Sequence, residues 1–179
     1  IRRAKEVVTE KNLDLPKKEA QEIASITGLG ALRYADLSQN RTNDYVFEWD
    51  KLLALEGNTA PYLLYAVVRI HGIFRKIDLH PGEGEESATP FDTDSEKGLA
   101  RRLLFFAPAF SQTIRELRPH YLCSYLYDLA GDFATFYNQD KVAVDEPEIR
   151  SRRLLLCART LAVLETGLSL LGITTLRKM

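Results

Sequence analysis

The sequence predicts an all-α fold, a helix bundle around one apolar core. Three segments repeat apolar residues at steps of three and four, which places these side chains on one face of a helix. Only residues 45–49 are aromatic and β-branched enough to suggest a strand or an extended segment. The 179 residues are 45% hydrophobic and 27% charged, as in globular domains rather than disordered chains. This length suits one substantial domain with room for part of another.

The first third of the chain is expected to contain short helices. Pro16 should open a helix, because proline is well tolerated in the first helical turn. Gly28 and Gly30 should interrupt that helix, since glycine disfavours helix interiors. The helices expected in this part cover residues 1–11, 17–26, 31–38 and 51–56.

The rest of the chain carries the three apolar stripes, each of which should face the core of the bundle. The stripes are Leu63, Ala66, Ile70, Ile73 and Ile77; Leu122, Leu126, Leu129, Phe133 and Phe136; and Leu154, Cys157, Leu161, Leu164, Leu168 and Leu171. A shorter helix over residues 99–106 should end near Pro108, and another should cover residues 109–117. Gly172 is placed to end the last helix, because glycine readily adopts the left-handed conformation of helix C-caps.

The acidic residues are concentrated in one connection. The net charge is −1, yet seven acids and no Lys or Arg lie between Asp78 and Glu96. The rest of the chain has 24 basic and 18 acidic residues. The nearly neutral total charge is therefore compatible with a basic binding surface. Together with its glycines and prolines, this composition predicts a flexible acidic loop over residues 78–98. The loop would serve as a solvated spacer or as an acidic binding motif.

The chain lacks the sequence patterns of catalytic and metal sites. Its three histidines, His71, His80 and His120, have no cysteine or carboxylate at ligand spacing, so no metal site is predicted. No glycine-rich phosphate loop, nucleophile elbow or acid–base pair is found, so no catalytic residue and no cofactor are assigned. Cys123 and Cys157 lie in apolar helical patterns and are expected to be reduced core residues of a cytoplasmic protein. No apolar run is long enough for a membrane span.

One helix face carries an unusual set of side chains. At about 100° per residue, Tyr62, Tyr65 and Arg69 share a face beside the first apolar stripe. Two rings and a guanidinium in this arrangement suit unstacked nucleic-acid bases and a nearby phosphate. They also suit rings packed on a neighbouring helix with Arg69 in an ion pair, or a protein–protein scaffold that holds a partner helix. Periodicity alone favours rings packed against a neighbouring helix.

Basic residues late in the chain are candidates for phosphate contacts. Arginines cluster at the start of the last helix, and two more cations lie near the end of the chain. The candidates are Arg152, Arg153, Arg177 and Lys178. Such contacts would fix the position of a nucleic acid without selecting its bases. Charged runs are also typical of ordinary solvated helix faces.

Several strings resemble arginyl-tRNA synthetases, the class I enzymes that join arginine to its tRNA. The end of that family's catalytic body is similar to GALRYADLS at residues 30–38, with residues 40–41 and 44–47. The entry to its anticodon-binding domain is similar to LEGNTAPYLLYA at residues 55–66, with Arg69. Later blocks of that domain resemble residues 118–120, 122–123, 125–130, 167–168, 171–173 and Met179.

The resemblance implies a helix bundle of the DALR type and a division of the chain. Residues 1–56 would be the helical end of the class I catalytic body, and residues 57–179 the DALR anticodon-binding bundle. Because the chain begins at Ile1 and its only methionine is Met179, we expect a C-terminal piece that lacks the upstream ATP-binding signatures. Such a piece should not aminoacylate tRNA by itself, whereas the full-length enzyme would use ATP with magnesium.

The resemblance also implies a partner and its contact residues. The partner would be the tRNA for arginine, bound by a cytoplasmic monomer that uses neither DNA nor a membrane. In that family, the residues that match Tyr62, Tyr65, Arg69 and Met179 approach the anticodon loop. The resemblance therefore changes the favoured interpretation of the tyrosine face from helix packing to base stacking.

Overall fold

The computed structural model describes residues 16–84 and 89–179, and this part of the chain contains seven α-helices and no strand. The helices are α2 (Lys17–Leu37), α3 (Trp49–Leu52), α4 (Ala60–Lys76), α5 (Asp94–Leu104), α6 (Phe106–Glu116), α7 (His120–Gln139) and α8 (Pro147–Leu170). The prediction of an all-α helix bundle is confirmed. Within the described residues, no helix combines the length and the apolar character needed to cross a membrane.

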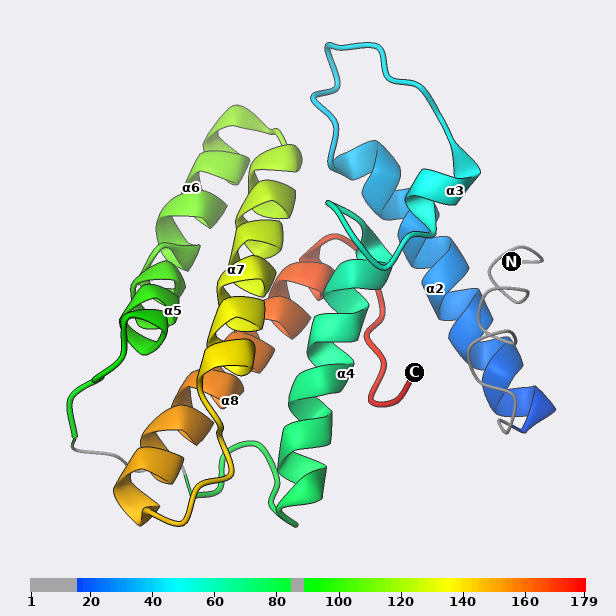
Figure 1. The fold of residues 1–179 in the computed structure, drawn as a ribbon. Coiled ribbons are helices and arrows are strands. Elements are labelled where there is room, and N and C mark those ends of the chain that lie inside the picture. The colour runs from blue at the N-terminus through cyan, green and yellow to red at the C-terminus, as the bar shows by residue number, and fades with distance from the viewer. Residues whose placement is uncertain (1–15, 85–88) are drawn as a thin grey trace.

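Three long helices form the middle of the molecule. α4, α7 and α8 contact one another, with α5 against both α7 and α8 and with α6 beside α7 (Figure 1). α2 packs on α4, and the C-terminal tail lies between these two helices (Figure 1). One side of α4 therefore faces the bundle, and another side faces the N-terminal part of the chain.

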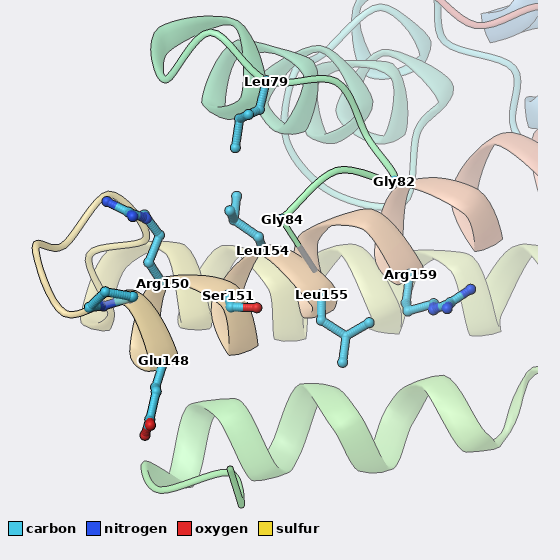
Figure 2. Close-up of a pocket in the computed structure, with 10 residues that line it drawn as sticks. Leu79, Gly82, Gly84, Glu148, Arg150, Ser151, Leu154, Leu155 and Arg159 are labelled. Carbon is cyan, nitrogen blue, oxygen red and sulfur yellow. The ribbon is translucent and has the colours of Figure 1, made fainter. Parts of the chain in front are cut away.

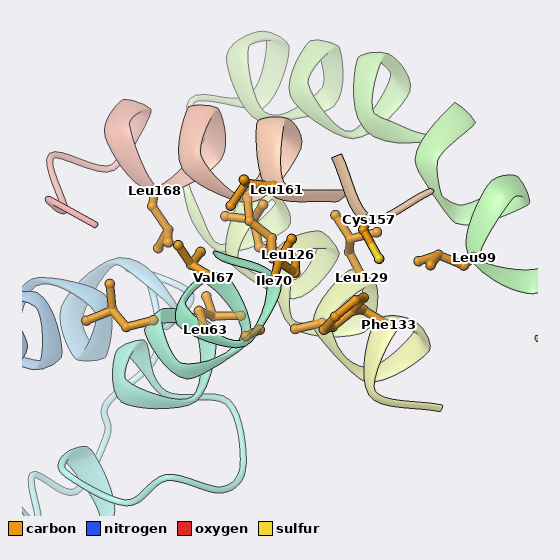
Figure 3. Close-up of a cluster of buried hydrophobic side chains, with 14 of the residues drawn as sticks. Leu63, Val67, Ile70, Leu99, Leu126, Leu129, Phe133, Cys157, Leu161 and Leu168 are labelled. Atoms are coloured by element: carbon orange, nitrogen blue, oxygen red, sulfur yellow. The ribbon is translucent and has the colours of Figure 1, made fainter. Parts of the chain in front are cut away.

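The apolar core lies between α4, α7 and α8, as the three stripes predict. Every stripe residue is buried except Ile77, which is half-buried against the core. Figure 3 shows these side chains meeting from three helices: Leu63, Val67 and Ile70 from α4, Leu126, Leu129 and Phe133 from α7, and Cys157, Leu161 and Leu168 from α8. Cys123 and Cys157 are both buried, as expected, and neither forms a disulfide bond among the described residues. Burial of each large apolar side chain contributes about 1.5–3 kcal/mol.

Two glycines determine how α8 packs and where it ends. An added Cβ on Gly167 would lie 2.5 Å from Cδ2 of Leu126, so the absence of a side chain allows α7 and α8 to approach closely. Gly172, at φ +72°, closes a Schellman motif with the last turn of α8. The predicted end of the last helix is confirmed, and the motif turns the chain back towards α2.

α2 differs from the prediction because it is continuous. Pro16 precedes its first residue, as expected, but the helix then passes through Gly28 and Gly30 without interruption. An added Cβ on Gly30 would lie 3.2 Å from Cγ2 of Ile173 in the C-terminal tail. Tertiary packing therefore keeps Gly30 in a helix, although glycine has a low intrinsic helix propensity. The helix predicted for residues 1–11 lies outside the described residues.

The acidic connection is shorter than predicted, because its last residues are helical. The Thr93 hydroxyl accepts the N–H of Glu96 at 3.1 Å and caps α5, so residues 94–98 belong to a helix. Pro108 does not end a helix; it is the third residue of α6, where it has no intrahelical N–H bond to lose. The aromatic residues 45–48 form no strand and lead into the single turn of α3.

Candidate nucleic-acid interface

α4 begins with a capped turn that fixes the first tyrosine. The Thr59 hydroxyl accepts the N–H of Tyr62 at 3.3 Å and donates to the carbonyl of Ala54 at 2.7 Å. Pro61 occupies the second position of the helix, where its missing N–H is not needed. The residues that start α4 therefore determine the direction in which Tyr62 leaves the helix.

Tyr62 is the more buried of the two predicted tyrosines. It is half-buried, and its ring centroid lies 5.6 Å from that of Tyr127 on α7, with the ring planes tilted by 58°. Burial raises the pKa of Tyr62, Tyr127 raises it further, and the nearby Arg69 opposes the rise. The Tyr62 ring thus packs on a neighbouring helix and offers only part of its surface to a ligand.

Tyr65 and Arg69 form an exposed pair one turn further along α4. Tyr65 is 40% exposed. The guanidinium carbon of Arg69 lies 4.6 Å from the Tyr65 ring centroid, and its Nη2 donates to the Tyr65 hydroxyl at 3.0 Å. Cation–π contacts of this kind contribute about 0.5–1 kcal/mol at exposed sites. In the part of the chain that the structure describes, Arg69 is held by aromatic rings and not by an ion pair.

A third tyrosine, which the sequence patterns did not single out, completes this group. Tyr137 lies in the last turn of α7, is 41% exposed, and has its ring centroid 4.8 Å from the Arg69 guanidinium carbon. The only signal in the sequence was an aromatic residue next to the buried stripe residue Phe136, and that signal does not reveal which helix the ring faces. We call Tyr65, Arg69 and Tyr137 the tyrosine–arginine cluster.

A groove opens beside the tyrosine–arginine cluster. It has a volume of about 570 Å³ and lies between the second half of α4 and the connection from α7 to α8. Lys76 and Lys141 are exposed along it, and Asn138 and Gln139 contribute amide groups. Amides donate and accept hydrogen bonds and lysine binds phosphate, so this lining suits a nucleotide.

The C-terminal tail lies along the flank of α4 that faces α2. Met179 is half-buried and packs against a small buried cluster of Ile23, Ala24 and Leu176, which Val68 of α4 also contacts. The structure thus brings Met179 to the helix that carries the predicted tyrosines. Its cluster shares no residue with the lining of the groove.

Arg177 and Lys178 are exposed next to Met179. The backbone carbonyl of Arg177 accepts a hydrogen bond from Nη1 of Arg75 at 3.4 Å, which ties the tail to α4. These cations therefore form a basic margin on the tail side of α4, where they are accessible to phosphate.

Arg152 and Arg153 are not accessible in this way, and their prediction as phosphate contacts is wrong. Arg152 is 6% exposed, with Nε 3.0 Å from Oε2 of Glu96. The Arg153 guanidinium lies 2.7 Å from the other oxygen of Glu96 and 2.9 Å from Oδ1 of Asp140. Burial alone would raise the pKa of Glu96, but the N–H of Asp92 and both guanidinium groups hold it below its ordinary value of 4.5. These arginines are neutralised inside the bundle.

A larger pocket, of about 710 Å³, lies between the start of α8 and the segment that follows α4 (Figure 2). Arg150 and Arg159 lie at opposite ends of it, with Leu154 between them (Figure 2). This pocket shares no lining residue with the groove or with the tyrosine–arginine cluster. It is therefore a separate feature and not part of the candidate interface.

Two of the three histidines have ring contacts in the described residues. His71 Nε2 lies 3.1 Å from Oε1 of Glu165 and links α4 to α8, and the His120 ring packs 4.3 Å from that of Tyr121. Among residues 16–84 and 89–179, no three His, Cys, Asp or Glu side chains gather as a metal site requires.

Comparison with known families identifies this arrangement. The model of the DALR anticodon binding domain matches residues 63–179, more than half of the chain. The chain belongs to the DALR anticodon-binding family. A second model, that of the class I (R) tRNA synthetase catalytic domain, matches residues 1–49 of this DALR chain. The resemblance to arginyl-tRNA synthetases is thereby confirmed.

Curated relatives of the DALR chain are arginine–tRNA ligases. It is 45% identical over 180 residues to the ligase of Enterobacter sp. (strain 638) and 46% identical over 182 residues to that of Escherichia fergusonii. Both alignments cover 100% of the chain and 31% of the relative. The chain therefore spans less than a third of the length of these ligases.

Solved structures show the same fold. The arginyl-tRNA synthetase of Thermus thermophilus superposes with a TM-score of 0.86 at 34% identity, over 99% of this chain and 30% of that one. The enzyme of Plasmodium falciparum gives a TM-score of 0.83 at 32% identity, over 99% and 32% of the two chains. The helix bundle is thus of the DALR type.

Proposed function

We propose that this DALR chain binds the anticodon arm of the tRNA for arginine, as part of a protein that joins arginine to that tRNA. The observation that carries the proposal is the tyrosine–arginine cluster, in which Arg69 lies against the rings of Tyr65 and Tyr137 beside a groove with two lysines. The family match and the names of the relatives supply the class of RNA. They favour this function over a helical protein–protein scaffold.

The exposed rings form the stacking surface. A base that stacks on an aromatic side chain gains about 1–3 kcal/mol, and a guanidinium beside the ring adds a cation–π contribution. Arg69 is already oriented by its hydrogen bond to Tyr65, so less side-chain entropy is lost on binding. To the anticodon loop we also assign Tyr62, which is half-buried against Tyr127, and Met179, whose polarizable thioether packs in the small cluster that Val68 of α4 contacts.

Phosphate contacts come from both flanks of α4. Lys76 and Lys141 lie along the groove, and Arg177 and Lys178 lie on the tail. An RNA strand that crosses α4 between these flanks places its bases on the tyrosine–arginine cluster. The phosphate contacts position the strand, whereas the rings and the amides of the groove contact its bases.

For the whole protein, we place the ligation chemistry outside this chain. No loop here has the glycine-rich backbone that cradles phosphates, so ATP and magnesium bind elsewhere and the chain alone does not aminoacylate tRNA. Residues 1–56 end the catalytic body and residues 57–179 form the DALR bundle. The hydroxyl of Tyr34 lies 2.6 Å from Oδ1 of Asn58 across this boundary. The protein acts as a cytoplasmic monomer, without DNA or a membrane as partner.

Binding of labelled RNA tests this function. Three RNAs are compared: the tRNA for arginine, the same tRNA with an exchanged anticodon loop, and an unrelated tRNA. We expect the first to bind most tightly and the loop exchange to remove that preference. Equal affinity for all three RNAs at one salt concentration would overturn the proposal, because nonspecific phosphate contacts would then account for all binding.

A further inference from the structure

Two long helices of the core end in different ways. α8 ends in the glycine motif at Gly172, which its own last turn holds in place. α7 ends at Gln139, and its cap residue Asp140 is extended, with φ −119° and ψ 112°. The last turn of α7 also has no basic residue to interact with its carbonyls. Yet this turn carries Tyr137, whose ring lies against Arg69.

Side chains from two other helices hold the end of α7 instead. Asp140 is 5% exposed, and its Oδ2 accepts hydrogen bonds from the hydroxyls of Ser95 and Thr93, the latter at 3.0 Å. Its Oδ1 accepts from Nη2 of Arg153 at 2.9 Å. Nη1 of Arg153 donates to the backbone carbonyl of Lys141 at 2.7 Å. Side chains from the start of α5 and the first half of α8 therefore form hydrogen bonds with Asp140, and Arg153 of α8 also bonds to Lys141 in the connection that lines the groove.

The orientation of the Arg153 guanidinium is itself fixed. Its Nε donates to Glu96 at 2.7 Å, and Glu96 is fully buried and also paired with Arg152. A guanidinium is a rigid planar fork, so three acceptors around it leave one orientation. Buried ion pairs add little net stability compared with apolar residues of the same size, whereas they do restrict geometry.

We propose that Arg153 and Asp140 are positioning residues for RNA binding, which hold Tyr137 against Arg69. This inference rests on the proposed function. The two residues act through Tyr137 and do not touch the RNA, because their polar atoms are already paired with one another and with buried groups of the bundle. The arginine that the sequence assigned to phosphate thus contributes to the same interface from inside the bundle.

A double-mutant cycle tests the positioning role. Asp140→Asn and Arg153→Lys, each alone and each combined with Tyr137→Ala, are compared for affinity to the tRNA for arginine. Each single substitution should weaken binding by about threefold to tenfold, an effect within the range of coupling between contacting residues. In the Tyr137→Ala background the same substitutions should add little. An equal loss in both backgrounds would overturn the proposal.

Asp132→Asn is the matched control. Asp132 also lies on α7, and its carboxylate accepts from Nε of Arg102 at 2.6 Å, which ties α7 to α5 away from the groove. Its substitution should leave tRNA affinity within about twofold of wild type, since distant sites act independently. If Asp132→Asn weakens binding as much as Asp140→Asn, a general loosening of the bundle explains both results and the proposal fails.

A spectroscopic readout separates this inference from the proposed function. In the intact protein with isotope-labelled arginine, the side-chain resonances of Arg69 should be shifted by the ring currents of Tyr65 and Tyr137. Asp140→Asn and Arg153→Lys should reduce that shift without any RNA, and Asp132→Asn should not. An unchanged shift overturns the positioning role even if tRNA binds. A reduced shift with no tRNA preference supports the positioning role and rejects the proposed function.

Discussion

Arg69 on α4 and Arg153 on α8 are both arginines that the sequence assigned to RNA contacts, yet their surroundings differ. Arg69 lies against two exposed tyrosine rings, so its charge stays available at the surface. Arg153 lies between the buried carboxylates of Glu96 and Asp140, and its charge is neutralised. One carboxylate comes from α5, far from α8 in the sequence, and the other from the cap residue that ends α7. A cluster of arginines therefore does not by itself indicate a nucleic-acid surface. The elements packed against the arginines determine whether their charges remain accessible.

Removal of the buried acid should have the largest effect. Glu96→Ala leaves the guanidinium groups of Arg152 and Arg153 without their shared partner, and stability should fall by about 3–5 kcal/mol. Urea denaturation followed by circular dichroism measures this change. Asp128→Ala, which removes an exposed partner of Arg102, should cost about 1 kcal/mol or less. Similar losses for both variants would contradict the distinction between the two regions.

Removal of the exposed rings should act on binding more than on folding. Tyr65→Ala and Tyr137→Ala should each weaken affinity for the tRNA for arginine by about 1–3 kcal/mol for the stacked base that is lost. Stability should fall by only about 1 kcal/mol, because each variant removes an exposed cation–π contact and leaves the apolar core unchanged. Fluorescence anisotropy gives the affinity. Phe105→Ala serves as the control, since Phe105 is 55% exposed and lies between α5 and α6; an equal loss there would exclude specific stacking.

Arg69→Gln should change the salt dependence of binding. If the guanidinium meets a phosphate, the slope of log affinity against log salt should fall by about one. Titrations at several salt concentrations measure this slope. Arg115→Gln is the comparison, because the Arg115 side chain is 74% exposed on α6 and outside the interface. The slope of that variant should match wild type, and an unchanged slope for Arg69→Gln would place its guanidinium away from phosphate.

Acid should destabilise the buried region without acting on the exposed one. The folded pKa of Glu96 lies below its ordinary value of 4.5, so its ionised form stabilises the protein above that pH. This stabilisation should disappear as the pH falls below 4.5 and through the folded pKa, because the unfolded chain then binds more protons. Denaturation between pH 7 and 3 measures the effect, and Glu96→Gln should flatten the profile. A profile of the same shape in Glu96→Gln would assign the acid sensitivity to other carboxylates.

Helical spacing was sufficient for the core and for half of the candidate interface. The stripes of α4, α7 and α8 are buried as predicted, apart from the half-buried Ile77. Apolar side chains at steps of three and four lie on one face of a helix, and that face is removed from water when it packs against other helices. The same spacing placed Tyr65 and Arg69 together. It did not reveal Tyr137, because the contact between Arg69 in the middle of α4 and the last turn of α7 depends on how the two helices cross.

Local preferences failed where tertiary packing opposed them. Gly28 and Gly30 were expected to break α2, but the packing of this helix on α4 and the tail keeps it intact. Glu96 was assigned to a solvated acidic loop, although Thr93 caps a helix there and two arginines draw the carboxylate inside. In both cases the intrinsic preference of the residue was judged correctly, but it gave no information about the residues that pack against it in the fold.

The sequence by itself determined that this protein is a helix bundle and which face of α4 carries tyrosine and arginine, because both follow from the fixed 3.6-residue period of a helix. The tertiary structure decided which charges stay available. It set Arg69 against two rings at the surface and buried Arg152 and Arg153 with Glu96. The physical reason is that ion pairing and burial depend on distances between helices. The spacing of residues along one helix does not determine those distances.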